Sequence, residues 1–417
     1  MQAETLLRYR GIFQQELGNI LRYWQTYAID RPNDDFHGAV DLENRPVPGV
    51  NKSCVLIARI LWTFAAAARL EGREDYAAVA DSAYRVLLSQ FWDRAHGGFF
   101  MAVTPAGQIA DPSKHTYMQA FAIYALCQYF RLNGSAAVLA LIRDAFALFE
   151  AKTKDPNHPG YLEAFTRDWQ PIAENRLADN NEPKSMNSHL HLLEAYATLF
   201  QVWPDPEVAT RLRELLLLFL DKIIRPSGHL GIFFDDAFNE TEPSQGICSF
   251  GHDIEASWLL CEAAEALGDE ALLARTRELA SKMLDAVERV GFDKDGGLFL
   301  ESYRHGSHVR TNKHWWLQAE TLVGFMNGFE LTGQPRYWDN VRLSWQFIDQ
   351  HVIDHERGEW FTKVNRLGVP FLVEPAGDPS PYYRNDWKVD PWKCPYHNGR
   401  ACMEMIRRID SVLAAQR

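Results

Sequence analysis

The chain has 417 residues, of which 47% are hydrophobic and 24% are charged, and these are ordinary proportions for a globular protein. Its formal net charge is −12, with acidic and basic residues interspersed along the whole length. This balance argues against nucleic acid and anionic membrane surfaces, which bind basic faces, and favours a neutral or weakly charged small molecule as the ligand.

The first 20 residues alternate charged and apolar side chains at helical spacing and lack the uninterrupted apolar core of a signal peptide. No run of about 18 apolar residues follows, so we expect no membrane-spanning segment. The six cysteines form no C-x-x-C pair and several lie in apolar helical contexts, which favours buried free thiols over a disulfide framework. Together these features predict a cytoplasmic protein.

Long helices of two kinds alternate along the chain. Residues 53–72 and 119–134 are apolar nearly all round, which predicts buried helices. Residues 75–92 and 136–153 carry charge on one side, which predicts outer helices. Short links that often contain glycine join each buried helix to the outer helix after it.

A short turn motif recurs between these helix pairs: an acidic or polar turn, a glycine, then aromatic or β-prone residues. It occurs six times, beginning with "DDFHGAVD" and "DRAHGGFFMAV", and its glycines are 60, 62, 71, 66 and 61 residues apart. Six such units predict an all-α (α/α)6 barrel, a single domain over 1–417 with short β-hairpins in the connecting loops and inner helices around a central cavity. An open helical solenoid is the alternative. The six glycines are Gly38, Gly98, Gly160, Gly231, Gly297 and Gly358.

Polar residues interrupt the apolar inner helices near their starts. Arg59 lies among aliphatic residues, where a guanidinium needs a partner or an anionic ligand. His252 and Glu255, three residues apart, stack on one helical face, and we expect the carboxylate to orient the imidazole and raise its basicity. Any one of these residues alone could be a satisfied polar residue of the core. The others are Asn187, His189, His191, Glu194, Trp315, Trp316, Gln318, Glu320, Trp392, Tyr396, His397, Asn398 and Arg400.

Two alternative chemistries fit these residues less well. His189 and His191 suggest a metal site, but residues two apart point to different sides of a helix, and no H-E-x-x-H motif accompanies them. A glycosidase needs two carboxylates facing each other across the scissile bond, whereas the distinctive residues here are imidazoles with carboxylates one turn away. A non-catalytic sugar-binding toroid would keep the tryptophans without needing both His252 and His397.

Two histidines on different helices suit proton transfer at a carbon next to a carbonyl. Imidazole titrates near neutral pH, so one ring can remove a proton while the other delivers one. The enolate formed in between needs a positive partner, which Arg59 could supply. Trp316 and Trp392 offer flat apolar faces to a sugar ring.

The chain resembles the N-acylglucosamine 2-epimerase superfamily, and most closely its cellobiose 2-epimerase members, through "ARILWTF", "KHTYMQAFAIYAL", "SMNSHLHLLEAY", "FGHDIEASWLL", "WWLQAETLVGF" and "PWKCPYHNGRACME". The resemblance implies an (α/α)6 barrel that inverts C2 of the reducing-end aldose through ring opening, a cis-enediolate and reprotonation. It implies no metal and no other cofactor.

The resemblance also implies roles for individual residues. His252 and His397 match the two acid/base residues, Glu255 the partner of the first, and Arg59 the residue at the enediolate oxygen. His191 matches the family's histidine in "NSHLH", so His189 is expected to be peripheral. The matches to sugar-contacting positions are Tyr117, Asn187, Trp316, Glu320 and Trp392.

The segment 361–391 looks longer than in typical cellobiose epimerases and is expected at the cavity mouth. There it could add contacts to a second sugar or cover its place, so a D-mannose 2-epimerase is the alternative to a disaccharide enzyme. The expected partner is a small sugar, bound by a monomer or homodimer.

Overall fold

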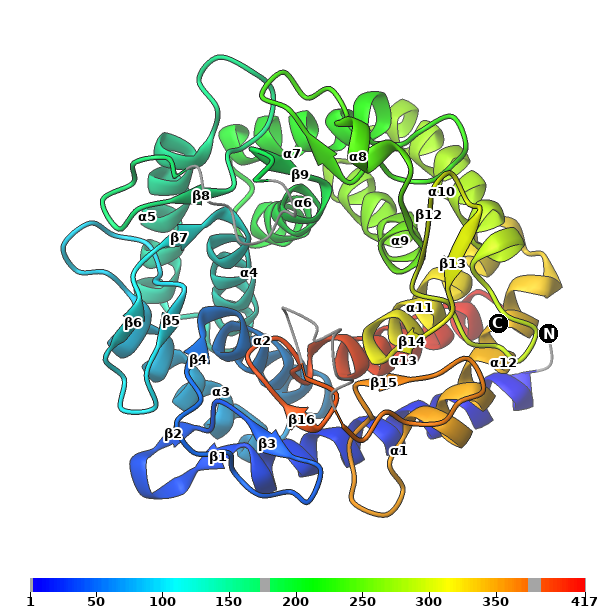
Figure 1. Cartoon of the computed structure of the whole chain (residues 1–417), viewed down its shortest axis with the longest axis horizontal. Coiled ribbons are helices and arrows are strands. Elements are labelled where there is room, and N and C mark those ends of the chain that lie inside the picture. The colour runs from blue at the N-terminus through cyan, green and yellow to red at the C-terminus, as the bar shows by residue number, and fades with distance from the viewer. Residues whose placement is uncertain (1–2, 173–180, 374–383, 417) are drawn as a thin grey trace.

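Twelve long helices dominate the computed structural model, which describes residues 3–172, 181–373 and 384–416. Six of them form an inner ring and six cover it from outside (Figure 1). The inner helices are α2 (Cys54–Glu71), α4 (Thr116–Asn133), α6 (Met186–Val202), α9 (Phe250–Leu267), α11 (Trp315–Thr332) and α13 (Tyr396–Ala415). The outer helices are α1 (Ala3–Tyr27), α3 (Glu74–Val86), α5 (Ala136–Thr153), α7 (Pro206–Leu218), α10 (Glu270–Val290) and α12 (Pro335–Phe347).

Contacts between the inner helices run round a circle. Each packs on the next in chain order, and α13 packs on α2 again, so the six surround one central space (Figure 1). Fourteen of the 18 residues of α2 are buried, against five of the 13 in α3, as the two hydrophobic patterns predicted. The (α/α)6 architecture is therefore confirmed, and the open solenoid is excluded by the contact between α13 and α2.

The sixth helix pair is built from the two ends of the sequence. The outer partner of α13 is α1, and Arg10 on α1 pairs with Asp410 on α13 at 2.7 Å. The two ends also meet through strands, because β16 (Trp387–Val389) pairs antiparallel with β3 (Val40–Asp41). Five units are thus continuous in sequence, and the sixth pairs α13, late in the sequence, with α1, early in the sequence.

The helix ends follow local sequence signals. Four inner helices end on a glycine in the left-handed conformation, which costs glycine less conformational energy than any other residue. These glycines are Gly72, Gly134, Gly268 and Gly333. Three outer helices continue into five-residue π-helical turns: η2 (Leu87–Phe91) after α3, η3 (Phe219–Ile223) after α7 and η4 (Ile348–Val352) after α12. Two short elements complete the helices: the 3-10 turn η1 (Arg31–Asn33) and α8 (Glu242–Gln245).

Short antiparallel strands connect the units at one end of the ring. Each strand next to an inner helix pairs with a strand of the following hairpin, as the turn motif predicted. The sheets are β1 (Ile29–Asp30) with β2 (Asp35–Phe36); β4 (Lys52–Ser53), β5 (Ala102–Val103) and β6 (Ile109–Asp111); β7 (Lys114–His115) with β8 (Ala164–Phe165); β9 (Lys184–Ser185) with β10 (Phe233–Phe234); β11 (Cys248–Ser249), β12 (Glu301–Tyr303) and β13 (His308–Arg310); β14 (Lys313–His314) with β15 (Lys363–Val364); and β16 with β3.

The repeated turn glycines are required by close packing. Gly160 has φ +85°, and a Cβ atom there would lie 2.5 Å from Nε2 of buried His189. The turn can therefore approach the inner helix only through a residue without a side chain.

Buried lysines fasten these hairpins. Lys184 of β9 donates 2.7 Å to Asp155 in the preceding turn, and four other strands carry an equivalent pair. The exception is β11, where Cys248 stands in place of a lysine and Arg225 donates to its Sγ and to Glu240 instead. The other pairs are Lys52–Asp35, Lys114–Asp93, Lys313–Asp295 and Lys388–Asp354.

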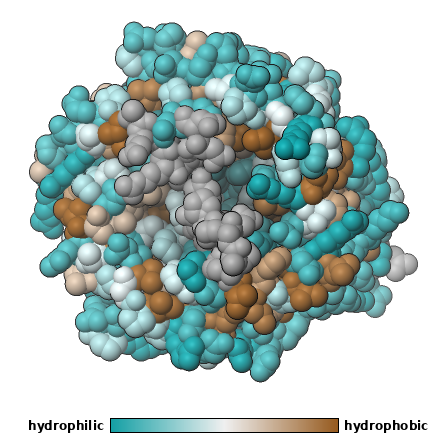
Figure 2. Space-filling view, in the orientation of Figure 1, coloured by the Kyte–Doolittle hydropathy of each residue, from teal (hydrophilic) through white to brown (hydrophobic). Residues whose placement is uncertain are grey.

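The surface agrees with the composition. Hydrophilic side chains dominate the rim, and the face viewed in Figure 2 is hollowed near its middle. All six cysteines carry free thiols, and five of them are buried. Within the described ranges, no helix has the length and apolar character needed to cross a bilayer.

Candidate active site

The inner helices bring the predicted polar residues to one end of the ring. Arg59 lies on α2, His191 on α6, His252 on α9 and His397 on α13, each within the first two turns. Side chains 338 positions apart in sequence thereby share one site, which is the arrangement that the sequence predicted.

His252 is held by a hydroxyl group. Its Nδ1 lies 2.7 Å from Oγ of Ser249, and its ring centroid lies 4.9 Å from that of Trp316. Burial lowers the pKa of His252 to about 3, and the neighbouring His191 acts in the same direction. The ring is therefore neutral near pH 7, and Nε2 is the nitrogen left for a substrate.

His397 is held by a carboxylate. Its Nδ1 lies 2.7 Å from Oε1 of Glu320 on α11. Because that oxygen also accepts a hydrogen bond from Arg400, the His397 Nδ1 carries the proton and Nε2 carries the lone pair. Burial, together with the nearby arginines, lowers the pKa of His397 well below its usual range, so this ring is also neutral. The Trp316 ring, 5.6 Å away, lies against both histidines.

Arg400 is the centre of a buried ionic cluster that the sequence did not assign to the site. Its Nη2 donates to Oε1 of Glu255 and of Glu320, each at 2.7 Å, and its Nη1 donates to Oε1 of Glu194. The rigid guanidinium fork can satisfy three carboxylates at once. Its sequence signals were its polar character near the start of an apolar inner helix and its position three residues after His397, on the same helical face.

The expected partnership of Glu255 with His252 is wrong. Oε1 of Glu255 accepts from Arg400, while the Nδ1 of His252 is bonded to Ser249. Burial raises the pKa of Glu255 well above its usual range, and the charge of Glu320 adds to the shift. Glu255 therefore holds a proton more readily than an ordinary glutamate, and its buried Oε2 has no hydrogen-bond partner in the described ranges.

Glu320 also differs from its expected place against the sugar. It is fully buried, and its Oε2 accepts a hydrogen bond from Nε1 of Trp258 at 3.1 Å. Its Oε1 is hydrogen-bonded to His397 and Arg400. Its hydrogen bonds therefore fix the orientation of His397 from behind.

His191 has its own carboxylate on the same helix. Its Nδ1 lies 3.1 Å from Oε2 of Glu194, three residues later. Burial opposes ionisation of Glu194, but Arg400, His191 and Tyr396 outweigh it and bring the pKa of Glu194 to about 2. His189, which we expected to be peripheral, is fully buried, and its two ring nitrogens contact the carbonyl of Ser185 and the amide of Tyr161.

Arg59 is a buried guanidinium without a carboxylate. Among the described residues, its hydrogen bonds go to the Tyr117 hydroxyl at 2.8 Å, the Trp392 carbonyl at 3.2 Å and Sγ of Cys394 at 3.8 Å. Its Nε donor is buried and has no partner among the residues that the structure describes. Since arginine stays charged at any physiological pH, this positive charge remains available to an oxyanion.

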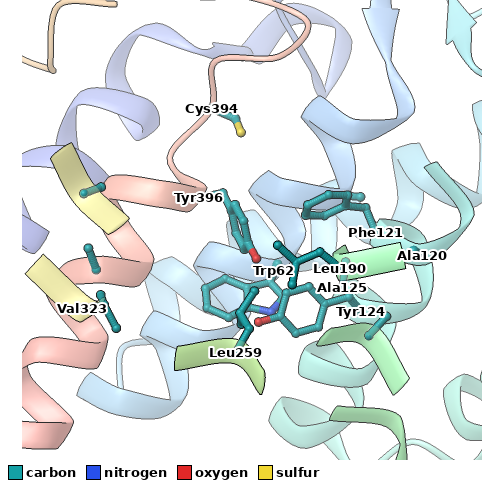
Figure 3. Packing of buried hydrophobic residues seen from close by; sticks show 14 of the residues in the cluster. Trp62, Ala120, Phe121, Tyr124, Ala125, Leu190, Leu259, Val323, Cys394 and Tyr396 are labelled. Carbon is teal, nitrogen blue, oxygen red and sulfur yellow. The ribbon is translucent and has the colours of Figure 1, made fainter. Parts of the chain in front are cut away.

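Aromatic rings close the inner side of the site. Phe121 lies 4.3 Å from the Arg59 guanidinium carbon, and Tyr396 lies between Arg59 and Arg400 at 5.0 and 4.3 Å. Trp62 and Tyr124 pack beside Tyr396, where Figure 3 shows the three rings turned toward one another. These rings exclude water and so strengthen the electrostatic interactions above them.

The remaining sugar-contact candidates border this space to different degrees. Asn187, Trp316 and Trp392 are half-buried, and the Asn187 Oδ1 has no partner within the described ranges. Tyr117 is buried, with its ring 5.0 Å from His191 and 5.8 Å from Trp392.

One group in the described chain has the composition of a metal site: Glu255, Glu320 and His397, whose ligand atoms lie within 4.8 Å of one another. Arg400 already donates to both carboxylates, so a cation occupies the position that a metal would take. These residues do not fit a metal as they stand.

The segment 361–391 is described except for residues 374–383, so the prediction about its length at the cavity mouth falls partly outside the described residues. Its described strand β16 lies beside β3, and Thr362 donates to the carbonyl of Trp387.

Comparison with known proteins adds four relationships. A family model described as N-acylglucosamine 2-epimerase (GlcNAc 2-epimerase) matches residues 36–384. A cellobiose 2-epimerase of Bacteroides fragilis is 38% identical over 94% of this chain and 97% of its own length. The solved structure of cellobiose 2-epimerase from Spirochaeta thermophila superposes with a TM-score of 0.85 at 38% identity, covering 98% of each chain. A D-mannose isomerase of Thermobifida fusca is more distant, 27% identical over 84% of this chain and 85% of its own.

Proposed function

The chain belongs to the N-acylglucosamine 2-epimerase family, and from this premise we propose that it is a cellobiose 2-epimerase. It inverts C2 of the reducing-end glucose or mannose unit of a disaccharide. The observation that carries the chemistry is the placement of two neutral imidazoles, His252 and His397, from different helices against one ring, that of Trp316. The full-length relatives named cellobiose 2-epimerase support the disaccharide.

The proposed reaction begins with the open-chain sugar. One histidine removes the C2 proton through its Nε2, and the electrons move to the C1 carbonyl oxygen to form a cis-enediolate. The uncompensated charge of Arg59 stabilises that oxygen. The other histidine enters the step as an imidazolium, protonated on Nε2, and delivers that proton to the opposite face of C2. The first ring now holds the proton taken from C2, so the number of protons on the two rings is unchanged over a turnover.

The neutral resting state of the histidines supports the base role, and the ring that acts as the acid binds a proton before the step. An imidazole that is neutral at pH 7 can act as a base, and the buried Glu320 stabilises the imidazolium that forms at His397. The same carboxylates argue against glycoside hydrolysis. Glu194, Glu255 and Glu320 are all bound to Arg400, so they do not form a pair that faces a glycosidic bond from two sides.

Action on free mannose is the second candidate, favoured by the match to the D-mannose isomerase of Thermobifida fusca. Incubation with cellobiose, lactose, mannose and N-acetylmannosamine in turn separates the candidates. We expect C2 epimers of cellobiose and lactose as the main products. A preference for mannose, or a ketose product, would replace the disaccharide proposal.

The mechanism is tested in D2O by mass spectrometry and NMR of the product. We expect one deuterium at C2, because histidine protons exchange with solvent, and activity that survives exhaustive EDTA treatment. His252→Ala and His397→Ala should each lower the rate by about 10²–10⁴-fold, the usual effect of losing an acid/base group. Product without deuterium, or near-normal rates in both variants, would exclude two-histidine transfer.

A further inference from the structure

The two acid/base histidines are held by partners of different chemistry. His397 Nδ1 faces Glu320, whose two oxygens also accept from Arg400 and Trp258. His252 Nδ1 faces the Oγ of Ser249, a neutral hydroxyl, at 2.7 Å.

Ser249 differs from the serines at the same place in other units. Each stands at the end of a short strand, directly before an inner helix. Ser53 accepts a hydrogen bond from the Leu56 amide at 3.0 Å, and Ser185 from the Ser188 amide at 3.1 Å, the usual capping contact. Ser249 makes no such capping bond, and its hydroxyl instead contacts the ring of His252, the residue three positions later.

A hydroxyl and a carboxylate constrain an imidazole differently. A carboxylate only accepts, so Glu320 keeps the proton of neutral His397 on Nδ1 and the lone pair on Nε2. A hydroxyl both donates and accepts, so Ser249 can bond to His252 whether Nδ1 carries a proton or a lone pair.

We infer that Ser249 is a positioning residue that keeps His252 bonded in each of its protonation states, whereas Glu320 fixes His397 in one tautomer. As a base, His252 donates from Nδ1 to Ser249 and receives the sugar proton on Nε2. The imidazolium keeps that bond, and a neutral ring with its proton on Nε2 accepts from the serine hydroxyl. This inference rests on the proposed epimerase function.

The test compares Ser249→Ala with Ser249→Thr, which retains the hydroxyl. Ser249→Ala should lose about two- to tenfold in kcat/KM, the size of one neutral hydrogen bond, and Ser249→Thr should restore most of it. Both directions must slow equally, because the equilibrium between the epimers belongs to the sugars. Rates alone therefore cannot assign the defect to one histidine.

Deuterium uptake into recovered substrate makes that assignment. When His252 is impaired, the epimer whose proton His397 removes should exchange repeatedly before it inverts. The ratio of exchange to inversion should thus rise in Ser249→Ala for one epimer only. Glu320→Gln should raise it for the other epimer.

Ser53→Ala is the matched control, because it removes the corresponding hydroxyl from the start of α2. It should leave the ratios of both epimers unchanged. Ratios unchanged in Ser249→Ala, or raised equally for both epimers, would overturn the inference. Absence of epimerisation in the unmodified protein would instead overturn the proposed function.

Discussion

Arg400 shows how much of the site depends on a single side chain. It is almost completely buried, and carboxylates from three helices converge on its two terminal nitrogens. A buried carboxylate without a cation would be protonated or expelled. Arg400 thereby lowers the pKa of Glu194 and opposes the rise that burial causes in the pKa of Glu320, and these two carboxyl groups hold the rings of His191 and His397.

Glu163 is a buried carboxyl group with neutral partners. It accepts from the amide and hydroxyl of Ser185 and from the hydroxyl of Ser188, and burial raises its pKa to about 7. The folded protein therefore holds this proton more tightly than the unfolded chain, whose glutamates titrate near 4.3. The stability that Glu163 contributes is complete at low pH and is lost as pH rises from about 4.5 to 7.

Glu163→Gln removes this titration, since an amide stays neutral and its NH₂ can donate to Ser188. The variant should gain stability relative to the unmodified protein between about pH 4.5 and 7, with no further gain above pH 7.5. Urea denaturation of both proteins across this range measures the difference. A difference that is constant with pH would contradict the prediction.

The sequence predicted which residues gather at the site better than it predicted their partners. Arg59, His191, His252 and His397 could be found because each breaks an apolar pattern. The partner of Glu255 could not, because helical spacing fixes only a common face, and the competing Arg400 lies 145 positions away on another helix. A serine three residues before a histidine gives no signal, because it has the spacing of an ordinary helix cap.

At the scale of the element, the buried lysines determine how the hairpins meet the inner helices. Lys184 and Lys114 are both fully buried and each bonds an aspartate, but the two aspartates differ in their other partners. Asp93 also pairs with Arg167 through two hydrogen bonds of 3.0 Å, whereas the described ion pairs of Asp155 include only Lys184.

Lys184→Met should therefore destabilise the protein more than Lys114→Met. Removing one member of a buried pair costs about 3–5 kcal/mol when the remaining charge has no other cation beside it, and less when a second cation stays in place. Chemical denaturation of the two variants measures this difference. Double variants that also replace the aspartate by asparagine are the control, and they should recover part of the loss at Lys184 only. Equal losses in the two single variants would show that Arg167 does not compensate.

The helices could be predicted to within a few residues, whereas the turn motif predicted that hairpins exist but not where their strands begin and end. Outer residues 75–92, expected as one helix, form α3 followed by the π-helical turn η2. Most strands have two residues, too short for an alternating pattern, so the turn glycines were their only signal. The lysine positions were equally hidden, because the pattern breaks at Cys248, where Arg225 takes over.

At the scale of the whole molecule, the ring of helices is closed although its sixth unit combines two distant parts of the sequence. The unit formed by α1 and α13 packs like the five continuous units, and the link between α2 and α3 at Gly72 is exposed. A permuted chain that starts at Arg73, ends at Gly72 and joins α13 to α1 by a flexible linker should therefore fold and keep its activity. A chain opened after Leu61, in the buried middle of α2, should not.

Calorimetry and product analysis of the two permuted chains provide the measurement. A single cooperative transition in the Arg73 chain would also support the prediction of one domain over 1–417. Two separate transitions, or loss of activity in the Arg73 chain alone, would contradict it.

The late position of Arg400 has a consequence for biosynthesis. A ribosome releases α6, α9 and α11, with Glu194, Glu255 and Glu320, well before α13 emerges. Until then the three carboxylates have no guanidinium to share, and mutual repulsion and the cost of dehydration oppose their burial. The nascent chain can pair its helices as they appear, but we expect these three carboxylates to stay hydrated until α13 supplies Arg400. Arg400 thus ties the assembly of this buried cluster to the arrival of α13, so a chain truncated before α13 should not form the site.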